Sequence, residues 1–308
     1  MPKLFVYDTN RPKTSTITLA FARGAIRHNS ETNGKWQVKH MPITHYLQYG
    51  LPGDMRQGDA VATLGILRGT GEMLKDVKSK NLDYYYIDHA YFCPGYGGKC
   101  WLRITKNGHT CTNLQTVDKD RWNGFHKHHG YQCLPWKQNK DRGRNILVLP
   151  PTGAVAWFFN QGPDEWLNSI VNKLKTLLPE KEHFRIQVRR KPKEPVVDGR
   201  GNLLELKTYP QQDQPLEHAL MDAQCVIAYN SMVALEATMK GIPVITSENS
   251  CCTKVSFNLD VYNNQLHPEE FNIEPINRVP LLYWLAYNQW KRRDIEDGTA
   301  WRMLQEQN

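Results

Sequence analysis

The stretch CVIAYNSMVALEATMKGIPVIT, residues 225–246, decides the fold class. CVIAYN is an apolar run typical of a buried strand, and IPVIT, directly after Gly241, is a second one. Between them, MVALEATMK has the composition of a helix that ends at the glycine. A strand, a helix and another strand in close succession form the unit from which helix-covered parallel sheets are built. The stretch therefore predicts an α/β fold.

The same alternation occurs on both sides of an irregular central region. Strands are predicted at residues 4–8, 36–43, 59–67, 83–92, 144–150, 184–192, 225–230 and 242–246. Helices are predicted at residues 15–28, 69–81, 165–179, 216–223 and 232–240. The alternation is interrupted from 93 to 143 by polar, basic and aromatic residues. We therefore predict two Rossmann-like domains with a cleft between them, residues 1–143 and 144–275.

A helical tail is predicted over residues 276–308. It carries Trp284, Trp290 and Trp301, and so aromatic a segment must bury one face. The tail packs either on its own domain or, as we expect, back across to brace the first domain.

Composition predicts a cytoplasmic globular protein without membrane association. The chain has 308 residues, of which 40% are hydrophobic and 23% charged. Its beginning is too polar for a signal peptide, and no apolar run approaches the roughly 18 residues that span a bilayer. A net charge of +8 and a pI near 9.0 favour polyanionic partners such as nucleotides or nucleic acid.

The seven cysteines are predicted to be reduced, because their number is odd and no secretory signal precedes them. Four of them share a region with three histidines: Cys93, Cys100, Cys111, Cys133, His126, His128 and His129. These spacings lack the CxxC pair of common zinc sites, so we predict no metal and keep a structural zinc ion as the alternative.

Ligands of open parallel sheets bind beyond the carboxyl ends of the strands, which makes the residues there candidates for function. Those residues are Asp8, Asp88, His89, Thr152, Gly153, Arg189, Arg190, Lys191, Asn230 and Ser231. Asn230 and Ser231 are good helix caps, and the N–H groups of a helix start also bind phosphate. Glu236 follows in an otherwise apolar helix, where it either points to solvent or accepts hydrogen bonds from a ribose diol.

NSMVALEATMKGIPVI, from Asn230 onward, resembles the nucleotide-binding segment of GT-B glycosyltransferases. VRRKP, residues 188–192, is similar to the basic strand end in the same domain of capsule-type transferases. The resemblance implies that Ser231 contacts phosphate and Glu236 the ribose, while Arg189 or Lys191 neutralises a diphosphate leaving group. It implies a nucleoside diphosphate sugar as donor, UDP favoured, and no tightly bound cofactor.

We identify no DxD metal motif of the GT-A type, because the one Asp-x-Asp triplet, residues 118–120, lies in the irregular basic region and not at a predicted strand end. This fits a metal-independent, inverting transfer. Thr152 and Gly153 form either a second anion contact or a simple turn.

A proton acceptor is predicted at the end of the aromatic strand LDYYYIDHAYF. The strand is similar to one in phage DNA glucosyltransferases that ends in the catalytic aspartate, which implies that Asp88 is the base, with His89 beside it. Asp8 is the second choice. Alternatively, Asp88 caps a turn and His89 packs on tyrosines.

Residues 118–145 alternate cations with aromatic side chains, a pattern that suits phosphate contacts and base stacking. The candidates are Lys119, Arg121, Trp122, Lys127, Trp136 and Arg142. With the resemblance to phage DNA-modifying glycosyltransferases, they favour double-stranded DNA carrying 5-hydroxymethylpyrimidine as acceptor. The alternative for this segment is a solvated basic linker. The alternatives for the function are a glycosyltransferase for capsule, lipopolysaccharide or another glycan, a sugar-nucleotide epimerase, and a non-catalytic nucleotide- or nucleic-acid-binding module.

Overall fold

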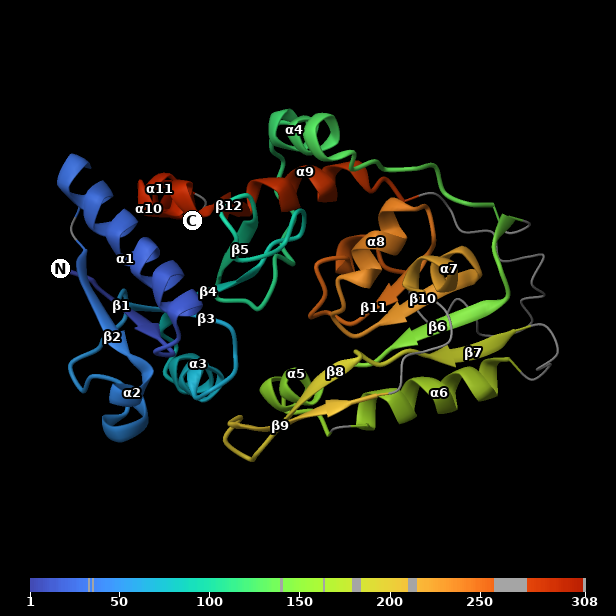
Figure 1. Ribbon diagram of the computed structural model, residues 1–308, viewed down its shortest axis with the longest axis horizontal. Coiled ribbons are helices and arrows are strands. Elements are labelled where there is room, and N and C mark those ends of the chain that lie inside the picture. Colours follow the sequence, from blue (N-terminus) through green and yellow to red (C-terminus); the bar gives the residue numbers. More distant parts are fainter. Residues whose placement is uncertain are drawn as a thin grey trace. The chain divides into compact units, whose positions relative to one another are not determined.

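The computed structural model describes residues 1–32, 34, 36–138, 141–162, 164–178, 184–209, 215–257 and 276–306. The chain forms two compact units (Figure 1). Unit 1 comprises Met1–His109, Val197–Leu203 and Ala286–Asn308, and unit 2 comprises Thr110–Val196 and Leu204–Leu285. This division differs from the sequence boundary after residue 143, because residues 110–143 lie with the second unit.

Unit 1 is built on a six-stranded sheet of order β12-β5-β4-β3-β1-β2. Its strands are β1 (Lys3–Asp8), β2 (Gln37–Pro42), β3 (Ala60–Leu64), β4 (Asp83–His89), β5 (Trp101–Lys106) and β12 (Gln289–Lys291). Strands β1 to β4 are parallel, which confirms the sequence prediction, whereas β5 runs antiparallel to β4, and β12 antiparallel to β5. Neither β5 nor β12 was predicted.

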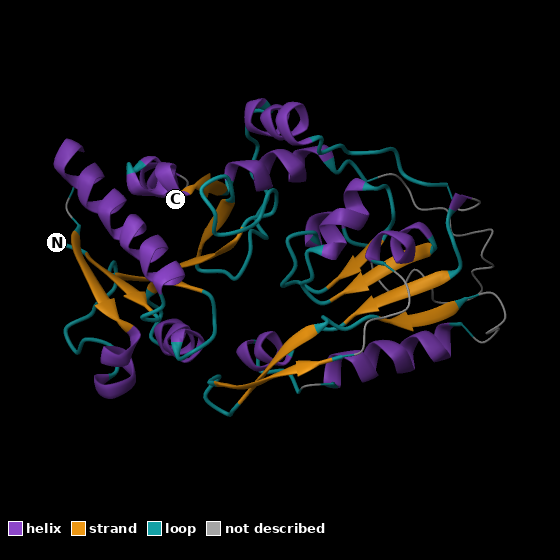
Figure 2. Cartoon of the chain, in the orientation of Figure 1, coloured by secondary structure: helices purple, strands orange, loops and turns teal. Residues whose placement is uncertain are grey.

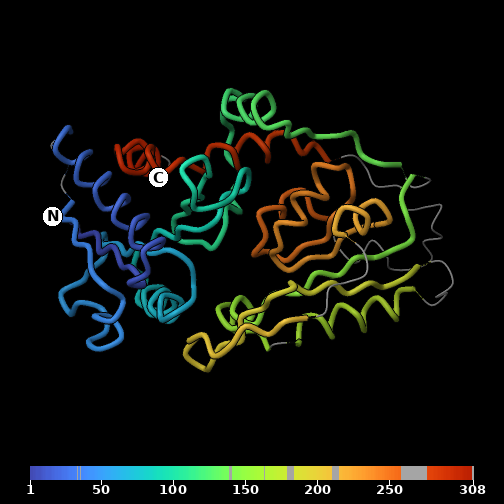
Figure 3. The backbone as a smooth tube through the Cα atoms, in the orientation of Figure 1, coloured from blue at the N-terminus to red at the C-terminus, as the bar shows by residue number. Residues whose placement is uncertain are grey.

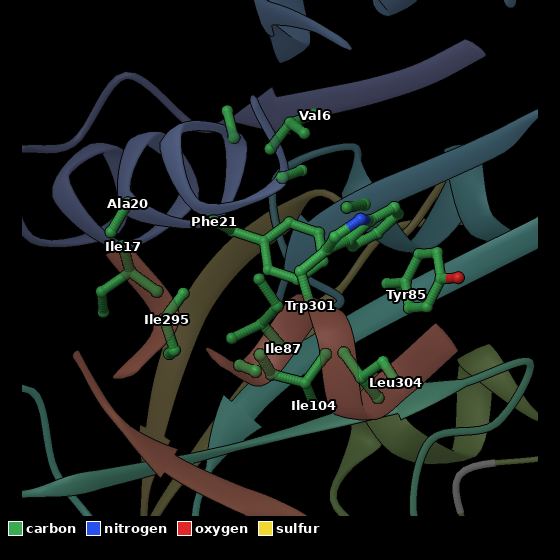
Figure 4. Close-up of a cluster of buried hydrophobic side chains, with 14 of the residues drawn as sticks. Val6, Ile17, Ala20, Phe21, Tyr85, Ile87, Ile104, Ile295, Trp301 and Leu304 are labelled. Carbon is green, nitrogen blue, oxygen red and sulfur yellow. The ribbon is translucent and has the colours of Figure 1, made fainter. Parts of the chain in front are cut away.

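The helices of unit 1 are α1 (Pro12–Thr32), α2 (Ile43–Tyr49), α3 (Thr70–Ser79), α10 (Arg292–Glu296) and α11 (Thr299–Glu306). Of these, α1, α10 and α11 pack around one hydrophobic cluster (Figure 4). The Trp301 ring meets those of Phe21 and Tyr85 at centroid distances of 5.5 and 5.2 Å. Trp301 is fully buried, so α11 is fixed to α1 and β4, and the last helix runs beside the first in the tube of Figure 3. The prediction that the tail's tryptophans are buried is confirmed.

Unit 2 is built on a four-stranded parallel sheet of order β11-β10-β6-β7. Its strands are β6 (Asn145–Leu149), β7 (Arg185–Val188), β10 (Ala223–Ala228) and β11 (Val244–Thr246), and a separate hairpin is formed by β8 (Lys193–Val197) and β9 (Leu203–Thr208). The helices are α4 (Asp120–His129), α5 (Gly153–Phe158), α6 (Glu165–Leu177), α7 (Leu216–Met221) and α8 (Val233–Met239), with a 3-10 turn at Thr253–Val255. Helix α9 (Val279–Tyr287) contains the division between the units.

Helices cover both faces of this sheet (Figure 2). The amphipathic helix α6 packs its apolar face, including Leu167 and Leu174, against Ile146 and Ile227 of the sheet. Helices α7 and α8 lie on the opposite face. The predicted α/β class is therefore confirmed for both units. None of the helices in the described ranges is long and apolar enough to cross a membrane.

Both sheets contain a topological switch point. In unit 1 the chain leaves β1 for β2 on one side and returns to β3 on the other, so the switch lies between β1 and β3. In unit 2 the chain leaves β6 for β7 and later returns to β10, so the switch lies between β6 and β10. Ligands of open α/β sheets bind outside the carboxyl ends of the strands at such points. The two edges thus define where functional side chains are expected.

Candidate functional site

Asn230 and Ser231 follow β10 and stand at the switch point of unit 2. Both are half-buried, and Ser231 Oγ accepts a hydrogen bond from the Val233 N–H at 3.2 Å. Helix α8 begins at Val233, two residues later than the Asn-Ser start that the sequence suggested. Its other end is held where Gly241, at φ 75°, touches the Pro135 backbone so closely that a Cβ would collide with the carbonyl oxygen. The turn after β10 is therefore fixed from both ends of the helix.

Glu236 is exposed on α8, whereas the residues on both sides of it are buried. Partial desolvation raises the pKa of its carboxyl group, and the charge of Lys240 opposes that shift. Within the described ranges no hydrogen bond or ion pair reaches this carboxylate. Glu236 is thus available to an external donor of hydrogen bonds, as its predicted role requires.

Thr152 and Gly153 stand at the start of α5, on the β6 side of the same switch point. Thr152 Oγ1 accepts from the Val155 N–H at 3.4 Å, so this residue caps the helix. The Gly153 N–H donates to Glu194 Oε1 at 2.7 Å, and Glu194 is only 7% exposed. The N–H group that was predicted to contact an anion therefore already holds an internal carboxylate. No sequence pattern pointed to Glu194, which lies in the hairpin of β8 and β9 that was not predicted.

The basic residues after β7 divide into one structural arginine and two candidates. Arg190 pairs with Asp164, lies 3.9 Å from Glu194 and stacks over the Tyr209 ring at 5.4 Å. Burial lowers the pKa of Arg190, but its acidic partners outweigh that effect and the pKa is raised. Arg189 continues the sheet through its backbone N–H to the Val148 carbonyl, and Lys191 is exposed.

Asp8 ends β1 at the switch point of unit 1 and is 6% exposed. Its Oδ1 accepts hydrogen bonds from the Asn10 N–H at 2.6 Å and the Ser15 hydroxyl at 3.1 Å. His40 of β2 approaches the other oxygen, with Nε2 3.3 Å from Oδ2. Sequence reasoning missed His40, because only the pairing of β1 with β2 brings it to Asp8.

The hydrogen bonds of the Thr18 hydroxyl indicate which ring nitrogen of His40 carries the proton. Thr18 Oγ1 donates to the backbone carbonyls of Thr14 and Ser15, both at 3.2 Å, and lies 3.2 Å from His40 Nε2. Because its hydrogen is used on those carbonyls, Thr18 accepts from the ring. We therefore assign the Nε2–H tautomer to the neutral ring, which leaves the lone pair on Nδ1.

Asp88 is locked into a network at the end of β4. It accepts hydrogen bonds from the Tyr86 hydroxyl at 2.7 Å, Arg103 Nη2 at 2.9 Å and the His89 N–H at 2.7 Å. Burial raises the pKa of Asp88, but Arg103, His109 and these hydrogen bonds lower it more, and the net pKa lies below the usual value. About a quarter of the side chain, 24%, is exposed. Sequence reasoning missed Arg103 because it missed β5.

Two histidines complete this network. The His109 ring stacks on Tyr86 at 4.7 Å, and Nε2 lies 3.1 Å from the Tyr86 hydroxyl. Burial, with the charge of Arg103, lowers the pKa of His109 to about 3 against the pull of Asp88, so the ring is neutral. The His89 ring lies 4.4 Å from that of Tyr96, which matches the alternative in which His89 packs on a tyrosine.

The basic segment 118–145 presents fewer aromatic faces than its sequence suggested. Trp122 is 7% exposed and Phe125 2% exposed. The Trp136 indole donates to the Ile276 carbonyl at 3.0 Å, and the Arg278 guanidinium covers its ring at 3.9 Å. These rings are therefore not exposed platforms for stacking a base.

The cations of this segment are more accessible than its aromatic rings. Lys119 and Lys127 are exposed, whereas Arg121 and Arg142 are half-buried. Residues 139 and 140 lie outside the described residues.

All seven cysteines are free thiols. In the described part of the chain, no group of three or more His, Cys, Asp or Glu side chains is placed to hold a metal ion. The zinc alternative for Cys93, Cys100, Cys111 and Cys133 therefore finds no support there.

Neither a protein-family model nor a curated protein sequence matches the chain. Among solved structures, it is similar to the KpsC beta Kdo 2,4 transferase of Thermosulfurimonas dismutans, at 12% identity, covering 94% of this chain and 91% of that one, with a TM-score of 0.48. The KpsC beta Kdo 2,7 transferase of the same organism matches at 11% identity over 100% of both chains, with a TM-score of 0.44. Escherichia coli heptosyltransferase WaaC with ADP matches at 13% identity over 79% and 86%, with a TM-score of 0.22. Because these TM-scores are below 0.5, the fold class rests on the chain's own sheets.

Proposed function

We propose that the chain is a glycosyltransferase that moves a sugar from a nucleoside diphosphate sugar to a hydroxyl group, with the donor bound at the carboxyl edge of the unit 2 sheet. The observation that carries the proposal is the place of residues 225–246 in the fold. Their sequence resembles the nucleotide-binding segment of GT-B glycosyltransferases, and their strand β10 borders the switch point. Sequence and strand order are independent, and both favour a nucleotide site there.

In this proposal, Asn230 and Ser231 contact the phosphates and Glu236 accepts hydrogen bonds from the ribose diol. Arg189 and Lys191 follow β7, the strand beyond β6. Their positive charges neutralise the negative charge that develops on the leaving diphosphate. Such a transfer needs no resident metal, and UDP is the nucleotide that the sequence favours. An anion at Thr152 and Gly153 requires Glu194 to move aside.

For the proton acceptor we propose the pair of Asp8 and His40, with Asp88 as the alternative. His40 Nδ1 takes the proton of the acceptor hydroxyl, the oxygen attacks the anomeric carbon, and the bond to the diphosphate breaks with inversion. Asp8 then stabilises the imidazolium that forms. Asp88 is the weaker candidate, because three hydrogen bonds, one of them from the Arg103 guanidinium, already stabilise its anion.

The acceptor predicted from the sequence, double-stranded DNA with 5-hydroxymethylpyrimidine, depended on cations interleaved with exposed aromatic rings. The burial of Trp122 and the cover of Arg278 over Trp136 remove that support. DNA remains a prediction from charge and resemblance alone, and a capsule or lipopolysaccharide glycan is the other acceptor class. Transfer of label to hydroxymethylated DNA but not to plain DNA, with binding that weakens steeply with salt, distinguishes them.

The experiment for the donor is a thermal-shift panel of UDP-, ADP-, GDP-, CDP- and TDP-sugars. A ligand at 100 times its Kd stabilises the folded state by about 2.7 kcal/mol, a shift of several degrees for a chain of this size. The matching nucleosides are the control, because they lack the phosphates. If none of these donors raises Tm or is consumed, the proposed function is wrong.

A further inference from the structure

Two arginines follow the strands that border the switch point of unit 1. Strands β1 and β3 are parallel neighbours, with Tyr7 opposite Thr63, so their carboxyl ends lie side by side. Arg11 follows the end of β1 and Arg68 follows the end of β3. Both cations thus extend from adjacent loops at the position where ligands of open α/β sheets bind.

The loop that carries Arg68 is rigidly anchored. The buried hydroxyl of Thr70 donates to the carbonyls of Gly65 and Leu67 at 2.9 and 2.8 Å, and the Gly65 N–H donates to the Ile87 carbonyl at 2.9 Å. Arg68 itself has φ 65°, a left-handed conformation that costs free energy for a residue with a side chain. The surrounding bonds therefore hold this half-buried arginine in place.

The loop after β1 is anchored in a similar way. The Asn10 N–H is bound by Asp8, and the Ser15 N–H donates to the Arg11 carbonyl at 2.8 Å. The side chain of Arg11 is exposed. A fixed backbone at both arginines reduces the entropy lost when a ligand binds between them.

Neither arginine has an acidic partner within the described ranges. The two aspartates of this edge are engaged elsewhere: Asp8 with His40, and Asp88 with Arg103. Burial lowers the pKa of Arg68, the like charge of Arg11 lowers it further, and only Tyr96 opposes them. Two cations that repel each other at a ligand-binding edge are stabilised by an anion that bridges them.

The N-terminal ends of two helices add to the positive electrostatic potential around Arg11 and Arg68. Helix α1 begins at Pro12, extends over 21 residues and has no acidic residue in its first turn. Helix α3 begins at Thr70, and Glu72 in its first turn offsets part of its contribution. The free N–H groups of both helix starts add positive potential beside the arginines.

We propose that Arg11 and Arg68 form a binding site for an oxyanion, a carboxylate or a phosphate group, at the switch point of unit 1. That this anion belongs to the sugar acceptor rests on the proposed function, whereas the binding site itself does not. The acceptor would then be an acidic saccharide or a sugar phosphate, held at the same edge as Asp8 and His40.

The test is calorimetric titration of the full chain with glucose 6-phosphate and with glucuronate, which present the two oxyanions on the same sugar skeleton. Arg11→Gln and Arg68→Gln are the test variants, and Arg27→Gln, exposed on α1, is the matched control. We expect each test variant to weaken binding of the preferred ligand about tenfold or more, since each removes a charge-assisted hydrogen bond. Arg27→Gln should bind as the wild type does.

Saturating nucleoside diphosphate separates this site from the donor site. If the oxyanion still binds with the donor site filled, and the two test variants still bind nucleoside diphosphate, the two sites are independent as proposed. If neither oxyanion binds, or if Arg11→Gln and Arg27→Gln weaken binding equally, the proposal is overturned whatever the donor experiment gives. Arg11 is exposed, so Arg11→Gln should keep the wild-type Tm. An unchanged Tm shows that weaker binding by this variant is not caused by loss of folding.

Discussion

Unit 1 and unit 2 place polar side chains at the same topological position but use them differently. Beyond β1 and β4 of unit 1, both carboxylates are held: Asp8 by His40 and Asp88 by Arg103. Beyond β10 of unit 2, Glu236 is exposed, and the charge of Lys240 acts on it without an ion pair in the described ranges. A fixed, paired group suits a chemical step that needs defined geometry, and an open group suits a ligand that brings its own donors. The carboxyl edges of the two sheets are therefore suited to two different tasks.

The largest effect is expected on transfer when the Asp8–His40 pair is broken. Asp8→Asn and His40→Gln should lower kcat about 100-fold or more, because general base catalysis contributes that much, while donor affinity stays constant. The measurement is single-turnover transfer with donor affinity determined separately, and His128→Gln, exposed on α4, is the control. Full activity in both variants would return the role of base to Asp88.

The ion pair at Asp88 should matter more for folding than for chemistry. Asp88→Asn leaves Arg103, 5% exposed, without its counter-charge, and should lower the free energy of unfolding by about 3 kcal/mol. Asp54→Asn breaks the pair of the exposed Asp54 with Lys3 and should lower the free energy of unfolding far less than Asp88→Asn does. Urea denaturation compares the two. If both variants lose the same small amount of unfolding free energy and Asp88→Asn abolishes transfer, Asp88 is the base and its structural role is contradicted.

The open groups of unit 2 should affect donor affinity alone. Ser231→Ala and Glu236→Ala should each weaken binding of the nucleotide sugar about tenfold, the usual value of one hydrogen bond to a charged group. Tm should stay unchanged in Glu236→Ala and fall slightly in Ser231→Ala, which also loses the hydrogen bond from the Val233 N–H. Glu217→Ala removes an exposed carboxylate from α7 and should leave affinity as it is. Isothermal titration measures all three variants. The comparison between the two edges fails if the donor binds Glu236→Ala as tightly as wild type.

The parts of the chain that the sequence predicted are those where burial alone determines the element. The apolar runs of β1, β3, β6 and β10 are unmistakable, since strands covered on both faces need continuous apolar residues. Strand β5 was missed because Arg103 and Thr105 are buried within it, and their polarity conceals the pattern. His40 and Glu194 were missed because their partners are brought to them by strand pairing and a hairpin, which local spacing does not encode.

Substitution of His109 is expected to have the smallest effect at neutral pH. The contribution of this residue to the pH dependence of stability appears only at acidic pH. Its pKa is about 3 in the folded chain and near 6.5 when unfolded, so below pH 6.5 the unfolded chain binds the proton first. Stability is therefore complete above pH 6.5 and falls as the pH drops toward 3, with Asp88 adding the same trend only below about pH 4. His109→Asn should flatten the dependence of the urea midpoint on pH between 6.5 and 4, whereas His128→Asn should retain the wild-type slope. If the urea midpoint depends on pH in the same way in wild type and His109→Asn, the ring is not held neutral against Tyr86. His109 would then not belong to the network of fixed side chains around Asp88 in unit 1.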